Sequence, residues 1–152
     1  MRVQIIRENG GPEVFQPAEL ERPAPSAGQV LVEISAASVN SADLMARSMG
    51  PVVNFIPAPP AVLGMDFAGT VIEVGEGVTN YAVGDEVFGC AGGVARHQGT
   101  LAEYISADVR LIAKKPKSLS MAEAAALPLV SITAFEALVD RLHVKERQKV
   151  LI

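Results

Sequence analysis

Few side chains in this sequence combine a reactive group with a local setting that would expose it to a ligand. His97 is one, because it lies within residues 92–99, a glycine-rich stretch that is expected to form a loop. Such loops can line a substrate pocket, and an imidazole there could donate a proton. The alternative is an exposed loop histidine without a chemical role, which is the commoner case.

Cys90 is the single cysteine of the chain, so no disulfide can form within it. A metal site built on several cysteines is excluded for the same reason. Asp66 is expected to be a structural carboxylate, and hydrogen bonding near a cleft is the alternative role for it.

Three further polar residues, Asn40, Asp43 and Thr133, have local explanations. Asn40 precedes a short helix expected over residues 41–48, where it suits the N-cap position, and Asp43 then lies in the favourable first turn. Thr133 lies early in a later helix, and its hydroxyl can bond to backbone atoms near the break at Pro128. A structural role does not exclude a second role in ligand binding for any of the three.

The first two thirds of the chain has the pattern of short β-strands separated by turns. The longest candidate covers residues 29–39 and places Val30, Val32 and Ile34 on one face. Short strands at this spacing predict a sandwich or a partly open barrel. The other expected strands cover residues 3–6, 14–20 (which could pair back on the first), 62–74, 85–90, 101–106 and 110–113.

Helical spacing replaces this pattern after residue 117. Ser120 and Glu123 form a capping box ahead of an alanine run, in which each side chain satisfies a free backbone N–H group. Pro128 divides this short helix from a longer one, whose apolar residues recur at helical spacing: Ile132, Phe135, Leu138 and Leu142.

The last residues, 148–152, are expected to start a buried strand, which is how a βαβ unit opens. A glycine-rich dinucleotide loop would be expected directly after such a strand. On its own the strand would pair with a second copy, exchange with it or fray. We therefore expect a homodimer, or self-association through this segment.

Composition narrows the class of protein. Hydrophobic residues make up 49% of the chain and charged residues 20%, which predicts a packed core. The apolar runs are short, and the first residues lack the apolar segment of a secretory signal. The net charge of -4 argues against a nucleic-acid or anionic-membrane surface. We predict a cytoplasmic protein that binds neither nucleic acid nor membrane.

Four short segments together resemble the quinone-oxidoreductase branch of the medium-chain dehydrogenase/reductases. Any one of them would be weak evidence, because glycine-aspartate turns are common, whereas their order and spacing make a specific signal. The likeness spans nearly the whole chain. The segments are VNSAD at 39–43, GMDFAGTV at 64–71, VGDEV at 83–87, and LPL at 127–129 leading to TAF at 133–135.

The resemblance implies a mostly β chain of the α+β class. Residues 1–116 would form a GroES-like, partly open β-barrel on the substrate side. Residues 117–152 would form a helical crossover and the first strand of a Rossmann nucleotide-binding domain, truncated before its cofactor loop. In this family the active site lies between the two domains, so a further segment is expected to complete both.

The resemblance also implies roles for individual residues. Asn40 and Asp43 match family residues near the nicotinamide and its ribose, and are the candidate catalytic residues. Asn40 and Thr133, which matches a threonine near the nicotinamide carboxamide, are the candidate cofactor-binding residues. The candidates that would line the substrate pocket are Met45, Met65 and His97.

Departures from the family's zinc enzymes predict that zinc is absent. Zinc dehydrogenases of this superfamily hold catalytic zinc with a cysteine where this chain has Asn40 and a histidine where it has Met65. An amide and a thioether are poor zinc ligands. Their proton-relay hydroxyl matches Ala42, and their structural zinc needs four cysteines. Quinone-oxidoreductase relatives often carry a tyrosine at Met45, so the proton donor stays open.

The predicted function is hydride transfer from NADPH to an enone or quinone, without zinc, by an enzyme of which this chain is the N-terminal part. Catalysis would then rely on positioning and on hydrogen bonds to the developing enolate oxygen. NADH in place of NADPH stays open. The isolated chain is expected to be inactive, because the pyrophosphate and adenosine contacts would follow residue 152. The alternatives are a non-catalytic GroES-like module or fragment and, with less support, a zinc alcohol dehydrogenase.

Overall fold

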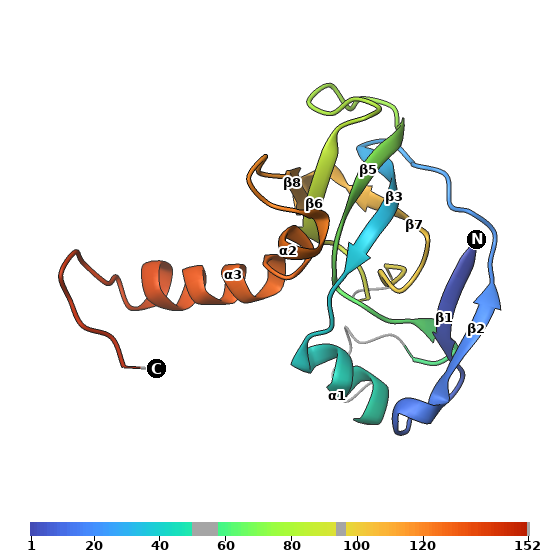
Figure 1. Cartoon of the computed structure of the whole chain (residues 1–152), viewed down its shortest axis with the longest axis horizontal. Helices are drawn as coiled ribbons and strands as arrows, with labels where there is room; N and C mark the ends of the chain where they lie inside the picture. The colour runs from blue at the N-terminus through green and yellow to red at the C-terminus, as the bar shows by residue number, and fades with distance from the viewer. Residues whose placement is uncertain (50–57, 94–96, 152) are drawn as a thin grey trace.

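A computed structural model describes residues 1–49, 58–93 and 97–151 of the chain. A curled β unit makes up most of it (Figure 1). A helical arm, formed by residues 128–151, extends from one side of that unit. Within the described ranges, eight strands form a three-stranded sheet in the order β2-β1-β4 and a five-stranded sheet in the order β7-β3-β5-β6-β8. The predicted mostly β architecture with a partly open barrel is confirmed.

The three-stranded sheet is built from the N-terminus. β1 (Arg2–Ile6) pairs antiparallel with β2 (Phe15–Glu19), as predicted, and on its other side with β4 (Ala61–Val62). A 3-10 turn, Pro12–Val14, joins the first two strands. Ile6 and Leu63 are buried between this sheet and the helix α1 (Ser41–Met49), together with Ala46 of that helix.

The five-stranded sheet contains most of the core, and every strand pair in it is antiparallel. The largest of its fully buried side chains include Phe67, Val30, Val32, Val71, Val87 and Ile105. Leu31 departs from the expected alternation, because it is also fully buried and both faces of the strand are therefore covered at that point. The strands are β3 (Gln29–Ala37), β5 (Asp66–Val74), β6 (Glu86–Cys90), β7 (Tyr104–Asp108) and β8 (Ile112–Lys114).

Three predicted strand boundaries were wrong. The strand expected over residues 62–74 is interrupted at Gly64, whose φ of 101° is a left-handed conformation that breaks the extended backbone. The strand expected over 101–106 begins only at Tyr104. The strand expected over 110–113 is preceded by a 3-10 turn, in which the Asp108 side chain accepts a hydrogen bond from Arg110 N.

The helical part follows the local signals closely. The Ser120–Glu123 capping box is present: Ser120 Oγ accepts from Glu123 N at 3.3 Å, and Glu123 Oε2 accepts from Ser120 N at 2.8 Å. It opens α2 (Met121–Ala125), and Pro128 then starts α3 (Pro128–Phe135) as predicted. A π-helical segment, Glu136–Arg141, continues α3. In the described part of the chain, every helix is too short or too polar to cross a membrane.

α2 and the arm differ in how they are packed. Ala124 and Ala125 of α2 are buried against Ala68 of β5, so α2 belongs to the β unit. Most of the large apolar residues of the arm remain exposed, with Phe135 at 60% and Leu142 at 65%. The helical spacing was therefore predicted correctly, but in this structure it forms an uncovered apolar surface.

The expected C-terminal strand is absent from the described residues. Residues 148–151 have no regular secondary structure, and Leu151 is 98% exposed. A strand exists only where a neighbour takes up its backbone hydrogen bonds, and in the described part of the chain no strand lies beside these residues. The domain boundary predicted after residue 116 falls in the turn between β8 and α2 and stays a prediction.

The Asp43 side chain connects the start of α1 to the turn between β4 and β5 by two hydrogen bonds. Its Oδ2 accepts from Asn40 N at 2.8 Å and its Oδ1 accepts from Gly64 N at 3.2 Å. The side chain is buried. Burial raises the pKa of Asp43 above its ordinary value, and the hydrogen bonds from Asn40 and Gly64 only partly offset that effect. Asp43 thus has a structural role that explains its place in the first turn.

The raised pKa of Asp43 predicts how stability depends on pH. A carboxyl group with a higher pKa in the folded than in the unfolded state favours folding below its unfolded value, and this contribution is lost as the pH rises through the folded value. Wild type should therefore lose stability relative to Asp43→Asn as the pH rises from about 4. Urea unfolding of both proteins across a pH series measures the difference.

Asp85→Asn is the matched control with the opposite sign. The hydrogen bond from Ala82 N, followed by the contact with Lys114, lowers the pKa of this partly exposed carboxyl. Its contribution to stability is present at neutral pH and is lost as the pH falls through the lowered value. The free energies of unfolding of the two variants, each relative to wild type, should change with pH in opposite directions. A change in the same direction would contradict the assignment for Asp43.

Candidate functional site

A buried carboxylate, Asp66 at the start of β5, connects the β unit to the helical arm. Its side chain is fully buried. From the β unit, Asn40 Nδ2 donates to Oδ2 at 3.0 Å and Ser38 Oγ donates to Oδ2 at 3.3 Å. From the arm, Leu129 N donates to Oδ1 at 3.2 Å and to Oδ2 at 3.1 Å. One side chain therefore accepts hydrogen bonds from both parts of the molecule.

The hydrogen bond from Leu129 to Asp66 satisfies a backbone N–H group that has no partner within the helix. Leu129 is the second residue of α3, so its N–H has no partner within the helix. The residue before the helix, Leu127, has no side-chain capping bond. Asp66 takes over that function from a distant strand, and its negative charge also favours the N-terminal end of the helix dipole.

The position of Asp66 fixes which way the Asn40 amide points. A carboxylate whose oxygens accept hydrogen bonds offers no donor, so the amide nitrogen of Asn40 must face it. The amide oxygen then faces away from Asp66, and within the described residues no hydrogen bond reaches it. Asn40 does begin α1 through its backbone, because its carbonyl accepts from Asp43 N and Leu44 N, but its side chain does not cap the helix.

Thr133, like Asn40, uses its donor within the protein and, among the described residues, keeps its acceptor free. Its Oγ1 donates to the backbone oxygen of Leu129 at 2.9 Å, one turn earlier in α3. This bond is the local explanation that the sequence offered. The oxygen lone pairs of the hydroxyl remain as acceptors on an exposed part of the helix.

Asn40 and Thr133 lie along the same groove, between the start of α1 and the arm. The groove encloses about 630 Å³. Its walls are mainly apolar, and within the described residues it is lined by no acidic, basic or imidazole side chain. The other residues that line it are Ser41, Ala42, Leu129, Val130, Ala134, Ala137, Leu138, Leu142, Val150 and Leu151.

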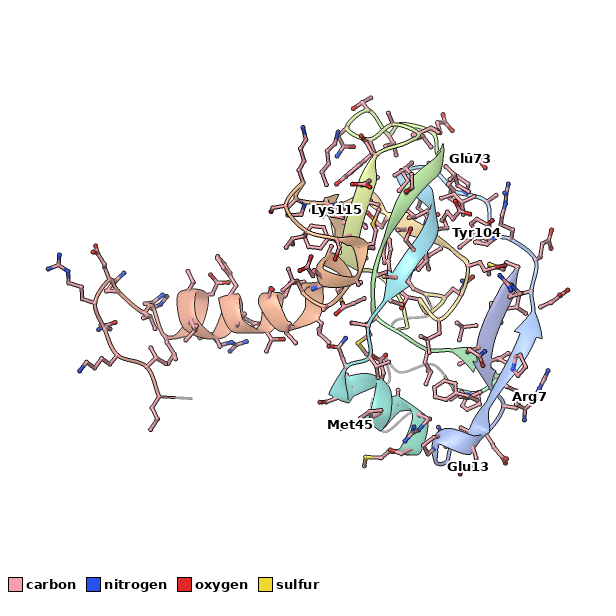
Figure 2. The ribbon with its side chains drawn as sticks, viewed as in Figure 1. Arg7, Glu13, Met45, Glu73, Tyr104 and Lys115 are labelled. Atoms are coloured by element: carbon pink, nitrogen blue, oxygen red, sulfur yellow. The ribbon has the colours of Figure 1, made fainter. Side chains whose placement is uncertain are left out.

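The remaining predicted site residues are not gathered in this groove. Met45 is exposed on α1 (Figure 2), and Met65 is buried beside Asp66 in sequence. His97 lines a different groove of about 440 Å³, against residues of β1 and β4 such as Ile5 and Val62. The predicted pocket roles of Met45, Met65 and His97 are therefore without support from the geometry and stay predictions.

Sequence reasoning missed Ser38 and placed too little weight on Asp66. Ser38 and Asn40 both bond to the same carboxylate, and their spacing of two residues after a strand is the signal that puts them on one side. Nothing local indicates Asp66, because its donors lie far away in the sequence.

Cys90 lies directly across from Asp66 in the β5–β6 pair. Burial, together with the negative charge of Asp66, raises the pKa of the Cys90 thiol to about 12. Among the residues that the structure describes, no three His, Cys, Asp or Glu side chains are grouped so that they could hold a metal ion.

Comparison with known proteins identifies the fold. Residues 26–117 match the alcohol dehydrogenase GroES-like domain. The chain is 44% identical over 114 residues to 2-methylene-furan-3-one reductase of Solanum lycopersicum, covering 72% of this chain and 29% of that protein. It is 34% identical over 146 residues to a chloroplast envelope quinone oxidoreductase homolog of Arabidopsis thaliana, covering 94% of this chain and 43% of that protein.

Solved structures agree with this assignment. An alcohol dehydrogenase superfamily protein from Novosphingobium aromaticivorans superposes with a TM-score of 0.91 at 46% identity, over 97% of this chain and 44% of that one. A mycobacterial protein solved in complex with NADPH superposes with a TM-score of 0.84 at 31% identity, over 97% of this chain and 43% of that one.

The chain spans less than half the length of each of these four proteins. The match to the domain model nevertheless covers more than half of the chain, and it includes β3, β5 and Asp66. The chain belongs to the GroES-like domain family of the medium-chain dehydrogenase/reductases, and it is similar to their quinone oxidoreductases.

Proposed function

We propose that the protein carrying this chain transfers hydride from NADPH to the conjugated double bond of an enone or quinone, without zinc. The observation that carries the proposal is the groove in which Asn40 and Thr133 lie together. The names of the tomato reductase and the Arabidopsis quinone oxidoreductase homolog support the substrate class, and the mycobacterial NADPH complex supports the cofactor.

The donor and acceptor pattern of the groove fits the nicotinamide end of the cofactor. Asn40 offers an amide oxygen, and Thr133 offers hydroxyl lone pairs, because their own protons are used by Asp66 and Leu129. Acceptors of this kind suit the N–H groups of a carboxamide or the hydroxyls of a ribose. The apolar side chains of Leu129, Val130 and Leu138 suit a flat ring.

NADPH would supply the hydride. Asn40 and Thr133 would hold the reacting ring in one orientation, which is the main contribution a protein makes to such a transfer. The apolar walls would keep water from the ring. Since the described groove holds no acidic or imidazole side chain, the proton that completes the reduction would arrive from solvent.

The chemistry of Asn40 and Met65, which stand where the zinc enzymes have ligands of the catalytic zinc, predicts a protein without bound metal. Asn40 carries an amide that is already bonded to Asp66, Met65 carries a thioether, and Cys90 is a single, un-ionised thiol. Elemental analysis of protein purified without chelators should give far less than one zinc per chain. Zinc near one per chain that survives dialysis would contradict the proposal.

Asn40→Ala should slow hydride transfer more than it weakens NADPH binding. Loss of the amide oxygen frees the ring to rotate, and misplacement costs roughly tenfold to a hundredfold in rate. Stopped-flow oxidation of NADPH by an enone or quinone measures the rate in the full-length protein, and a fluorescence titration measures binding.

Asn80→Ala is the matched control, because Asn80 is an exposed turn residue outside the groove. Equal rates in Asn40→Ala and wild type would show that Asn40 has no role in the transfer. If the full-length protein fails to oxidise NADPH with every enone and quinone that is tested, the result favours the alternative, a non-catalytic β-barrel module.

Residues 1–152 alone should bind NADPH only weakly. The groove reaches the nicotinamide end, whose few hydrogen bonds are worth roughly 1 kcal/mol each before the cost of association. The relatives are more than twice as long, and we propose that the rest of the parent provides the pyrophosphate site. Titration of the isolated chain should not saturate below roughly millimolar NADPH. Micromolar binding would contradict this expectation.

A further inference from the structure

A continuous chain of hydrogen bonds links the two residues assigned above to the nicotinamide end. Asn40 donates to Asp66, Asp66 accepts from the N–H of Leu129, and the carbonyl of Leu129 accepts from Thr133. Asn40 belongs to the β unit, and Thr133 belongs to the arm. Asp66 is the member that joins the two parts, and it is not itself among the residues that line the groove.

Each end of this series of hydrogen bonds sets one property of the groove. At Asn40, the carboxylate turns the amide oxygen outward, so the groove presents an acceptor and not a donor. At Leu129, the same carboxylate holds the first turn of α3, and Thr133 lies one turn further along that helix. The relative position of the two acceptors therefore depends on one buried side chain.

We propose that Asp66 is a positioning residue for hydride transfer. It fixes the hydrogen-bond polarity of the Asn40 amide, and it sets the distance between Asn40 and Thr133 through Leu129. This inference rests on the proposed function, because it acts through Asn40. It assigns Asp66 more than the role of a buried carboxylate that stabilises the fold.

Asp66→Asn separates these two roles. An asparagine oxygen in the place of Oδ1 still accepts from Leu129 N, and the amide nitrogen then replaces Oδ2, opposite Asn40 and Ser38 Oγ, which can both accept from it. The reverse placement would set the amide nitrogen against the N–H of Leu129, donor against donor. The Asn40 amide must then turn over, so that its oxygen accepts from residue 66 and its nitrogen faces the groove. The fold keeps its hydrogen bonds, while the groove changes from acceptor to donor at this point.

The experiment is a double-mutant cycle in the full-length protein with Asp66→Asn, Asn40→Ala and the double variant. We expect Asp66→Asn to lower kcat roughly tenfold to a hundredfold with a smaller change in NADPH affinity. The double variant should be no slower than Asn40→Ala alone, since Asp66 acts through Asn40. Asp85→Asn, a carboxylate that also accepts from a backbone N–H but lies outside the groove, should match wild type.

The outcomes separate the two proposals. Losses that multiply in the double variant, or an unchanged kcat in Asp66→Asn, would overturn the positioning role while leaving the site in place. An unchanged rate in Asn40→Ala would instead overturn the proposed site.

Asn40→Asp provides a second test if Asp66→Asn does not fold. It places two carboxylates at the position of a 3.0 Å hydrogen bond, and one proton must be shared between them. A protonated residue 40 can donate to Asp66 and present its carbonyl oxygen outward, as the amide does. The kcat of this variant, relative to wild type, should therefore recover as the pH falls.

Other titratable groups near the pair do not produce this recovery. Asp43 of α1 titrates in both proteins, so the ratio to wild type removes its effect, and the pKa of the Cys90 thiol on β6 is raised to about 12. A ratio that stays constant with pH would overturn the inference that Asn40 and Asp66 act as a pair.

Discussion

A carboxylate taken out of water must be surrounded by hydrogen-bond donors, because an unpaired charge in the interior costs several kcal/mol. The donors to Asp66 come from Ser38 and Asn40, between β3 and α1, and from Leu129 in the first turn of α3. The segment around Ser38 and Asn40, the start of β5 and the start of α3 are far apart in sequence, so the requirement brings them together at one point. The groove along Asn40 and Thr133 is the outer surface of that junction.

The β unit and the arm depend on this junction to different degrees. The β unit has its own core, in which Phe67, Val71 and Val87 are fully buried. The arm has no such core, since Phe135 and Leu142 remain exposed, and the start of α3 is held by the buried Pro128 and by the bond from Leu129 to Asp66. The β unit therefore supplies stability, and the Asp66 bond supplies the direction of the arm.

Features with a local cause were predictable from the sequence. The capping box at Ser120, the helix start at Pro128 and the pairing of the first two strands each depend on neighbouring residues. The strand expected at 148–152 is absent over the described residues 148–151, because a strand needs a partner that a local pattern cannot supply. The partner of the Asn40 amide was missed for the same reason, since it lies 26 residues away. Asn40 and Thr133 were named from family likeness, and only the fold shows that they share a groove.

The same carboxylate has a consequence for the one thiol of the chain. The thiolate form of cysteine is the species that attacks electrophiles, and conjugated carbonyl compounds are electrophiles that alkylate it. Burial and the charge of Asp66 keep Cys90 in its unreactive S–H form at physiological pH. The raised pKa therefore slows covalent modification of Cys90 by conjugated carbonyl compounds, even though its side chain is only partly buried.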